Sequence, residues 1–419
     1  MVEDNAVLDH DLCGDATIAS ALAMRAQWWV DHGAPRYAKR QPHPHDPHPD
    51  RPLRIGYVTA DLFLHSAALV FGNLIGAHDH SFAQTIVYSM TPAARYDHIT
   101  AQFVTKFGPN FRDVSHYRPE TIAQMIREDG IDILVDLSGY TPGNALRAFA
   151  EKPAPVQITG WGYATGLGWP CGVMDALIGD AVAFPPAMRQ KMSEQVIDLP
   201  CLLAYTIITE MPPPSALPVL RSHTPVFAVF QRTMKVQSAN LHLWTNLLQQ
   251  LPDAILQFKG HAHIPVPEWQ RWVRSEMAAV QDRIEFLPIT NQGEHFRAFQ
   301  HVDLSLDPWP QTGGVSTLES LAMGVPMLTL IGERPIQRTT ASINHVLKLD
   351  DFTVSSEIEY LDRAIAWVTD RTDELAKIRI GLRQRLERSP ICRGYARAAE
   401  AAYRALWYQW CDRAAESAA

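Results

Sequence analysis

The sequence predicts an α/β protein with two doubly wound parallel sheets and a helical C-terminal tail. From residue 54 onward, short apolar segments rich in β-branched residues alternate with amphipathic helical segments. This alternation weakens between about 180 and 224 and then begins again. The 419 residues exceed what one compact core accommodates and are sufficient for two domains.

In the first half, we expect strands over 53–60, 85–90, 131–139 and 155–162, and helices over 66–77, 95–107 and 118–128. These strands are apolar along most of their length, as in a parallel sheet covered by helices on both faces. Residues 15–34 predict one helix that ends before a proline. The Pro- and His-rich stretch 41–52 favours a surface linker, because dense proline supports neither helix nor sheet. A metal site at His43, His45 and His48 is the alternative.

In the second half, we expect strands over 226–230, 254–258, 283–288, 302–307 and 326–331, and helices over 238–250, 292–300, 315–323 and much of 357–412. The predicted organisation is an N-terminal helix and linker (1–50), two Rossmann-like domains (51–215 and 216–390) and a C-terminal helix (391–419). In such sheets, ligands bind at the carboxyl ends of the strands. We therefore expect the site in a cleft between the two halves.

Composition excludes several functional classes. The net charge of −8 gives no sign of a nucleic-acid-binding surface. Five scattered cysteines without CxxC spacing fit a reducing compartment, so we expect a cytoplasmic protein. The N-terminus lacks the pattern of a signal peptide, and no apolar run approaches the roughly 20 residues of a membrane span.

Two segments of the first half place polar groups directly after predicted strands. Asp61 and His65 lie in TADLFLHSAAL (59–69), and a histidine there is suited to act as a base or to hold a sugar hydroxyl. Tyr140 and Thr141 lie in SGYTPGN (138–144), whose glycines allow close backbone approach. A capping or packing histidine and an ordinary turn are the alternatives.

Trp161 and Tyr163 lie in the glycine-rich segment KPAPVQITGWGYATG (152–166). Aromatic rings in such a loop stack on sugars or peptides, or simply pack in the interior. We expect them, with Asp61, Tyr140 and Thr141, on the sugar and acceptor side of the site.

In the second half, Gln231, Arg232 and Lys235 follow the first strand in VFAVFQRTMKVQS (226–238). A lysine just before a helix is suited to bind a diphosphate, because the ammonium supplies charge and the helix supplies amides. A solvated lysine is the alternative. The segment FLPITNQGEHFRAF (286–299) adds Thr290 and His295, which we expect beside the nucleotide; a surface histidine is the alternative there.

The segment LDPWPQTGGVSTLESLAMGVPMLTL (306–330) is the most specific. A Gly–Gly–x–Ser–Thr loop opens a helix directly after a strand, and the amides at a helix start bind phosphate. The residues expected at the phosphates are Gly313, Gly314, Val315, Ser316 and Thr317. Glu319 is placed to accept hydrogen bonds from the ribose diol. The sequence has no P-loop pattern and no GxGxxG after its first predicted strand, which argues against a P-loop kinase and a dinucleotide-binding dehydrogenase.

Together these segments resemble, from about Arg51 to Cys411, the catalytic region of the O-GlcNAc transferase/SPINDLY family, in particular its bacterial members. The segments that carry the resemblance include PDRPLRIGYVTADLFLHS, DGIDILVDLSGYTPGN and SPICRGYARAAEAAYRALWYQWC, besides 152–166 and 306–330. The resemblance implies a GT-B fold, with two Rossmann-like domains facing a cleft. It also implies an inverting, metal-independent glycosyltransferase that moves a sugar, first of all GlcNAc from UDP-GlcNAc, to a protein Ser/Thr hydroxyl.

The resemblance also implies roles for single residues. His65 falls on an active-site histidine that has been considered a base, and Lys235 on the lysine that neutralises the diphosphate. His295 and Glu319 fall on residues that contact the nucleotide and its ribose, and the 313–317 loop on the phosphate-contacting loop. We expect no cofactor and no metal, because Asp9 and Asp11 form the chain's one D-x-D pair, outside any core strand.

This sequence departs from the family pattern at several positions. Animal members have His-Thr-Thr where Gly314-Val315-Ser316 stands, and relatives have Phe-Asn-Asn or Phe-Asn-Gln where Phe230-Gln231-Arg232 stands. No 34-residue repeat is visible. The alternatives are therefore a transferase that uses UDP-glucose or GDP-fucose, one that acts on a glycan or small molecule, and a non-catalytic GT-B binding protein.

Overall fold

The computed structural model describes residues 3–163, 165–208, 210–260 and 266–418. The chain forms two compact units, Met1–Tyr205 with Gly394–Ala419, and Thr206–Arg393. The change between units comes after Tyr205 rather than after residue 215. The C-terminal helix, which the sequence predicts as a separate segment, belongs to the first unit.

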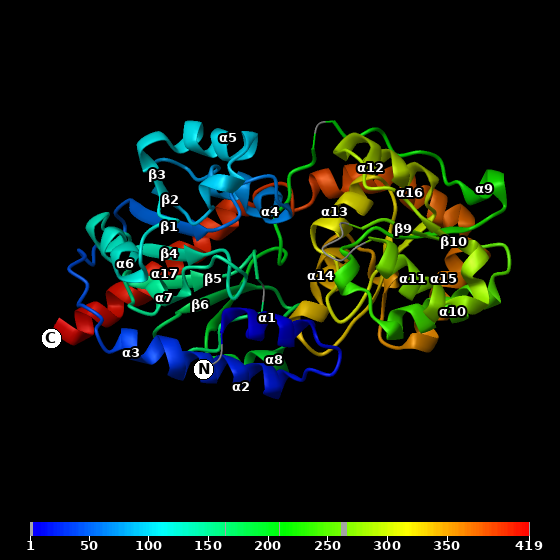
Figure 1. Cartoon of the computed structure of the whole chain (residues 1–419). Coiled ribbons are helices and arrows are strands. Elements are labelled where there is room, and N and C mark those ends of the chain that lie inside the picture. The colour runs from blue at the N-terminus through cyan, green and yellow to red at the C-terminus, as the bar shows by residue number, and fades with distance from the viewer. Residues whose placement is uncertain (1–2, 164, 209, 261–265, 419) are drawn as a thin grey trace. The chain divides into compact units, whose positions relative to one another are not determined.

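The first unit holds a seven-stranded parallel sheet of order β3-β2-β1-β4-β5-β6-β7 (Figure 1). Its strands are β1 Leu53–Thr59, β2 Ala83–Ser89, β3 Phe111–Asp113, β4 Ile133–Asp136, β5 Val156–Thr159, β6 Ala176–Gly179 and β7 Gln195–Asp198. Its α-helices are α1 Asp4–Leu12, α2 Ile18–Trp28, α3 Ala34–Tyr37, α4 Ser66–Ile75, α5 His98–Phe107, α6 Pro119–Glu128, α7 Leu146–Phe149, α8 Pro186–Arg189 and α17 Tyr395–Ala418.

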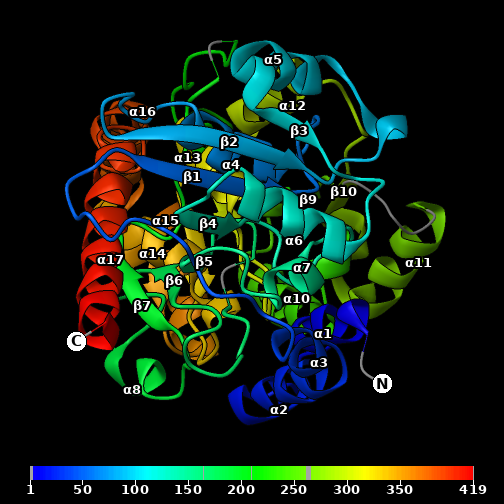
Figure 2. The same cartoon turned by 90° about the vertical axis from the view of Figure 1, so that its left-hand side faces the viewer.

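The two faces of this sheet bury different helices, because neighbouring residues of a strand point to opposite sides. Val58 belongs to a core cluster with Ile122 of α6 and Leu146 of α7. Figure 2 shows these two helices together beside the sheet. Tyr57, the preceding residue of β1, bonds Tyr403 of α17 instead, with 3.0 Å between the two hydroxyl oxygens. The C-terminal helix thus completes the first unit's second layer.

The second unit repeats the pattern in a six-stranded parallel sheet of order β10-β9-β8-β11-β12-β13. Its strands are β8 Val226–Val229, β9 Ile255–Phe258, β10 Ile284–Phe286, β11 Leu304–Leu306, β12 Met327–Leu330 and β13 Thr353–Val354. Its α-helices are α9 Val219–Ser222, α10 Ser238–Gln250, α11 Val266–Glu276, α12 Gln292–Ala298, α13 Val315–Ala322, α14 Thr339–Val346, α15 Glu357–Val368 and α16 Thr372–Arg388. Both strand orders confirm the predicted doubly wound sheets.

Two buried aspartates mark the ends of each of the central strands β4 and β11, in DILVD (132–136) and DLSLD (303–307). At the amino end, Asp132 Oδ2 accepts the backbone N–H of Arg54 (2.7 Å), and Asp303 Oδ2 accepts that of Val226 (2.9 Å). These bonds tie each central strand to the start of its neighbour, because a buried carboxylate requires hydrogen-bond donors.

The Pro- and His-rich stretch 41–52 runs along α17. Trp407 Nε1 donates to the carbonyl of His48 (3.2 Å), and Arg404 Nη1 donates to those of Pro49 (2.7 Å) and Arg51 (2.9 Å). These contacts agree with a surface linker and fix its path. Within the described residues, no group of three or more His, Cys, Asp or Glu side chains is placed to hold a metal ion.

The helix prediction over 15–34 differs most from the structure. The helical chain passes through a π-turn at Trp29–Gly33 into α3, with Pro35 in the first turn of that helix. Proline is tolerated there because the first amides of a helix need no intrahelical acceptor. The short strand β7 occupies part of the region where the sequence pattern weakens.

We predict that Arg379→Met destabilises the second unit by roughly 3–5 kcal/mol. Arg379 is fully buried, and its guanidinium donates to the carbonyls of Val302 (2.6 Å), Ser215 (2.8 Å) and Phe299 (3.1 Å). Methionine fills the space but leaves these carbonyls without donors. Urea unfolding followed by tryptophan fluorescence measures the change. Arg388→Met, at an exposed position of the same helix, is the control, and equal unfolding midpoints would contradict the prediction.

Candidate active site

The second unit's candidate site lies at the topological switch point of its sheet. β8 and β11 are neighbours, but the chain continues from β8 toward β9 and from β11 toward β12. The connections therefore diverge and leave a crevice at the carboxyl ends of these strands, which is where α/β sheets bind ligands. The segments 230–235 and 307–317 follow the two strands, so the structure brings the predicted diphosphate residues together.

Lys235 is held between the two segments. Its Nζ donates to the carbonyl oxygen of Thr312 (2.9 Å) and to Oε1 of Gln231 (3.3 Å). The same Gln231 oxygen accepts a hydrogen bond from Ser316 Oγ (2.7 Å). The ammonium is thus placed beside the start of α13.

Burial lowers the pKa of Lys235 to about 8, and the nearby guanidinium of Arg232 acts in the same direction. The carboxylate of Asp307 opposes this shift. Asp307 is itself buried, which raises its pKa to about 6 against the effect of its hydrogen bonds and of Lys235. At neutral pH both groups are mostly charged, so the site holds an ammonium that water solvates poorly.

The helix α13 starts at Val315, and its first intrahelical bond runs from Leu318 N–H to Gly314 O (3.1 Å). The amides before that bond have no acceptor within the helix, and they form its positive end. Gly314 contributes no side-chain cap. The amides of the loop are therefore suited to an anion, as the sequence predicts.

The hydroxyl of Thr317 does not take the position expected of a phosphate contact. Thr317 is fully buried, and its Oγ1 lies 2.9 Å from Oγ1 of Thr340. Thr340 Oγ1 in turn donates to the carbonyl of Gly313 (3.2 Å). Thr317 thus stabilises the loop from its buried side, through Thr340, while Ser316 remains partly exposed.

Two of the residues expected around the nucleoside, His295 and Glu319, also meet at this crevice. His295 Nε2 of α12 lies 3.6 Å from Oε2 of Glu319, and the imidazole packs edge-on against Phe299. Thr290 Oγ1 accepts a hydrogen bond from Lys259 Nζ (2.5 Å). Lys259 is not among the residues predicted from the sequence, although it follows the end of β9 as Lys235 follows the end of β8.

In the first unit, Asp61 and His65 follow β1, again at the switch point of their sheet. His65 Nδ1 accepts the backbone N–H of Ala67 (3.3 Å) as the cap of α4 and lies 3.6 Å from Oδ1 of Asp61. An imidazole whose Nδ1 accepts a hydrogen bond carries its proton on Nε2. In this arrangement His65 is suited to donate a hydrogen bond, and the capping alternative also holds.

The aromatic residues expected on the sugar side lie in the first unit's core. Tyr140 is fully buried; its hydroxyl donates to Leu167 O (2.9 Å) and accepts from Trp169 Nε1 (3.1 Å). Trp161 and Tyr163 are 4% and 6% exposed. These rings pack instead of presenting a sugar platform, because the interior satisfies their polar atoms.

Thr141 closes the turn in which Tyr140 lies. Its Oγ1 donates to the carbonyl of Ser138 (2.8 Å), and its side chain is partly exposed. Of the five residues expected on the acceptor side, Asp61 and Thr141 therefore retain some access to solvent.

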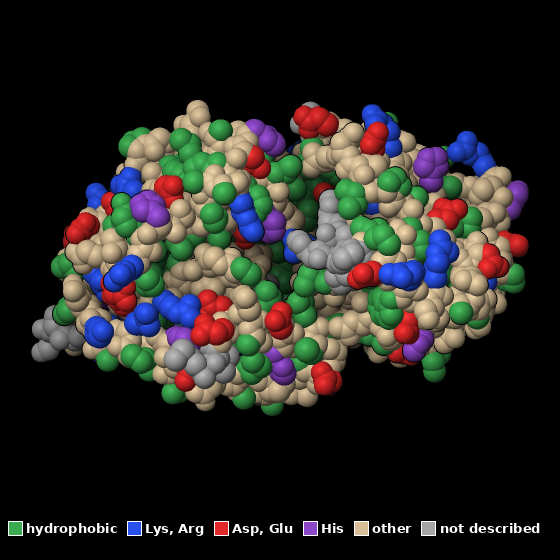
Figure 3. Space-filling view, viewed as in Figure 1, with side chains coloured by type: hydrophobic (Ala, Val, Ile, Leu, Met, Phe, Trp, Pro, Cys, Tyr) green, Lys and Arg blue, Asp and Glu red, His purple; other side chains and the backbone are tan. Residues whose placement is uncertain are grey.

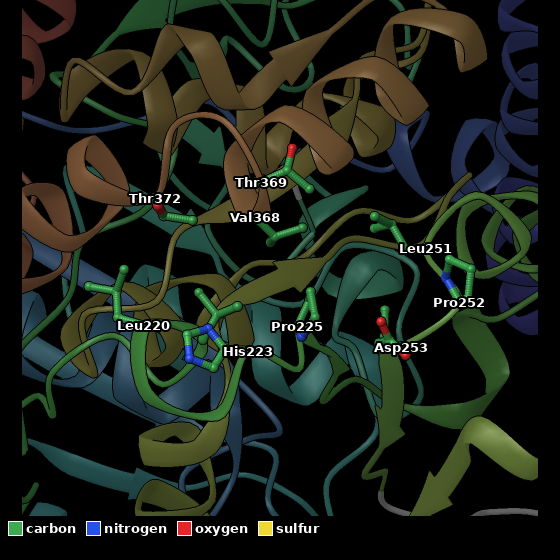
Figure 4. Close-up of a pocket in the computed structure, with 11 residues that line it drawn as sticks. Leu220, His223, Pro225, Leu251, Pro252, Asp253, Val368, Thr369 and Thr372 are labelled. Atoms are coloured by element: carbon green, nitrogen blue, oxygen red, sulfur yellow. The ribbon is translucent and has the colours of Figure 1, made fainter.

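Two hollows lie at the opposite, amino-terminal edges of the sheets. One of about 340 Å³ is lined by Pro225 before β8 and Ala254 before β9, with His223 at its rim (Figure 4). The other, of about 880 Å³, lies in the first unit beside Val156 and Asp175. Neither is lined by a residue predicted to bind the nucleotide sugar or the acceptor, so the candidate site is inferred from the side chains at the switch points.

Two further observations concern the charge of the surface and the apolar character of the helices. Positive and negative side chains are interspersed on the face that Figure 3 shows. In the part of the chain that the structure describes, no helix combines the length and apolar character needed to cross a membrane.

Among solved structures, the chain is similar to a lysine-to-methionine variant of O-GlcNAc transferase from Thermobaculum terrenum. The TM-score is 0.89 and the sequence identity 27%, over 98% of this chain and 78% of that chain. Two Rossmann-like parallel sheets and this likeness show the GT-B fold of glycosyltransferases.

The chain belongs to glycosyl transferase family 41, whose sequence model matches residues 30–206 and 217–398. It is 34% identical over 373 residues to the tomato protein named probable UDP-N-acetylglucosamine–peptide N-acetylglucosaminyltransferase SPINDLY, covering 87% of this chain and 40% of the relative. It is 27% identical over 327 residues to the Arabidopsis thaliana protein of the same probable activity named SEC, covering 75% and 33%. The chain thus spans 40% or less of these relatives' lengths.

We predict that Gly313→Ala weakens UDP binding at least about tenfold. A Cβ at this position would lie 2.1 Å from Thr317 Oγ1 and 2.8 Å from Gln231 Nε2, so the loop must shift. Titration calorimetry with UDP measures the effect. Gly381→Ala is the control, because its Cβ would meet no atom within 4 Å. Unchanged UDP affinity in the folded Gly313 variant would exclude this loop as the binding site.

Proposed function

We propose that this chain is an inverting glycosyltransferase that moves a sugar from a nucleotide sugar to a protein Ser/Thr hydroxyl. UDP-GlcNAc is the first donor to test, because both curated relatives described above carry it in their names. The observation that carries the proposal is the Lys235 ammonium held beside the start of α13. A cation and a helix N-terminus together suit a departing nucleoside diphosphate.

In the proposed reaction, the acceptor oxygen attacks the anomeric carbon while the bond from that carbon to the diphosphate oxygen breaks. The electron pair of that bond leaves with the diphosphate, where charge develops. Lys235 and the first amides of α13 stabilise this charge more in the transition state than in the bound donor. As the new glycosidic bond forms, the acceptor hydroxyl passes its proton to solvent water.

Other residues take supporting roles in this proposal. Glu319 binds the ribose hydroxyls, with His295 beside it at the nucleoside. His65 contacts the sugar or the acceptor through its Nε2 proton; to act as the base it would first have to release the Ala67 amide. We further propose that the chemistry needs no metal and takes place in the cytoplasm, a reducing environment that fits five cysteines outside any disulfide.

A donor screen by mass spectrometry tests the function. The chain is incubated with UDP-GlcNAc, UDP-glucose and GDP-fucose and a mixture of acceptor peptides, with and without EDTA. We expect one donor to yield a glycosylated peptide, and the yield to survive EDTA. Sugar transfer only to glycans or small molecules would replace the peptide acceptor. Nucleotide binding without transfer or hydrolysis would favour a non-catalytic binding protein, which the altered Gly314-Val315-Ser316 loop motivates.

Lys235→Ala is expected to lower kcat by on the order of a hundredfold or more, because it removes the cation that stabilises the leaving charge. Lys377→Ala, at an exposed position of α16, removes the same charge elsewhere and serves as the control. Steady-state kinetics with the donor found in the screen measures the effect. Turnover of the folded Lys235 variant at the wild-type rate would remove this role.

UDP affinity is expected to fall as the pH rises above about 8, the pKa of Lys235 in the free protein. The ammonium is the form that binds the diphosphate, and one pH unit above the pKa only about a tenth of it remains. Calorimetry between pH 7.5 and 9.5 should show a decline approaching tenfold per unit. Lys235→Arg should show a flat profile, since a guanidinium stays protonated there. A flat wild-type profile would contradict the assignment.

A further inference from the structure

Each sheet ends its central strand in a buried carboxylate with matching hydrogen bonds. In the first unit, Asp136 Oδ1 accepts the backbone N–H of Ser138 (3.0 Å), and its Oδ2 accepts Thr159 Oγ1 of the next strand (2.8 Å). In the second unit, Asp307 Oδ1 accepts the N–H of Gly313 (2.7 Å), and its Oδ2 accepts Thr329 Oγ1 of the next strand (2.8 Å). The shared bonds are a scaffold for the loop that follows.

The second unit adds one element to this scaffold. Gln231, the second residue after β8, donates from Nε2 to Asp307 Oδ1 (3.2 Å). The bonds to a loop amide and to a threonine occur in both units, so we attribute them to the fold. The bond to Gln231 is described for the second unit, so we attribute it to the diphosphate site.

The orientation of the Gln231 amide follows from its partners. Its oxygen accepts from Lys235 Nζ and Ser316 Oγ, and a lysine ammonium can only donate. Its nitrogen faces a carboxylate, which accepts when ionised. Gln231 is 5% exposed, and its amide already makes three of the four hydrogen bonds open to it, so it has little surface left for a ligand.

We propose that Gln231 and Asp307 are positioning residues: Asp307 holds the amide of Gln231, and Gln231 in turn sets the Lys235 ammonium and the Ser316 hydroxyl at the start of α13. This proposal deepens the proposed function and rests on it for its catalytic consequence. It also replaces the expectation that Gln231 touches the nucleotide sugar directly. Lys235 and Ser316 come from the two sides of the switch point, so the Gln231 side chain fixes the distance between the ammonium and the hydroxyl.

The charges around Lys235 give this arrangement a measurable electrostatic signature. Asp307 raises the pKa of Lys235, whereas burial and Arg232 lower it. Asparagine keeps the shape of the aspartate and removes its charge. In Asp307→Asn, the pKa of Lys235 should therefore fall further below its ordinary value, by about half a unit or more.

Lysine-selective ¹³C NMR of the nucleotide-free chain measures this pKa, with Lys235→Arg to assign the signal. Asp136→Asn is the matched control, because it makes the same change at the equivalent place of the other sheet. It should leave the Lys235 titration unmoved. An unchanged Lys235 pKa in a folded Asp307→Asn variant overturns the role of Asp307. This readout does not depend on nucleotide binding, so it stands even if the chain transfers no sugar.

A double-mutant cycle between Gln231 and Lys235 tests the positioning step and keeps the proposal falsifiable if Asp307→Asn does not fold. Gln231→Leu keeps the size of the side chain and removes its hydrogen bonds. It should lower kcat about tenfold or more in the wild-type background, and at most about threefold when Lys235 is already alanine. An equal factor in both backgrounds overturns the proposal. If no donor is turned over but UDP binds, the same cycle is read from UDP dissociation constants; a chain that binds no UDP refutes the proposed function instead.

Discussion

The carboxylate of Asp307 gathers hydrogen bonds from three separate segments, and the geometry of the second unit's site depends on it. Gly313 comes from the loop after β11, Gln231 from the loop after β8 and Thr329 from β12. Burial alone makes this carboxylate costly and raises its pKa. The three donors offset that cost, so the loops are held where the carboxylate needs them.

Both sheets place buried, hydrogen-bonded aspartates at the two ends of the central strand. The aspartates at the two ends have different roles. At the amino ends, Asp132 and Asp303 join neighbouring strands and stabilise the sheet. At the carboxyl ends, Asp136 and Asp307 fix the loops that follow. A parallel sheet gathers its carboxyl ends at one edge, so a fixed loop there becomes a site, whereas the same chemistry at the other edge only stabilises the sheet.

The sequence allowed the sheets and many helices to be predicted, because continuous apolar runs such as 226–230 and amphipathic stretches such as 238–250 carry their own signal. It did not reveal β13, whose two residues are too short for a pattern. Side-chain direction was the harder part. Tyr140 lies beside a loop of the right kind, yet its ring points into the core, and no local pattern distinguishes these directions.

The candidate site could likewise be predicted only in part. The Lys235 position and the 313–317 loop could be predicted, because a lysine and a glycine-rich helix start follow two strands. The bond between Gln231 and Asp307 could not, since it joins residues 76 positions apart and depends on the strand order. Lys259 was overlooked for a related reason, because only the fold brings it to Thr290.

The electrostatics of the site explain why such a network is needed. Lys235 is charged at neutral pH although burial disfavours its ammonium, and Arg232 lies near enough to disfavour it further. The positive end of α13 points to the same place. Without a ligand these like-signed fields repel one another, and an unrestrained lysine side chain would turn toward water. Gln231 and the Thr312 carbonyl supply neutral acceptors that hold the ammonium without cancelling its charge. A second carboxylate in their place would neutralise the lysine and compete with the diphosphate. The neutral acceptors contact the ammonium directly, and the carboxylate of Asp307 lies beyond Gln231. This arrangement keeps the site both folded and attractive to an anion.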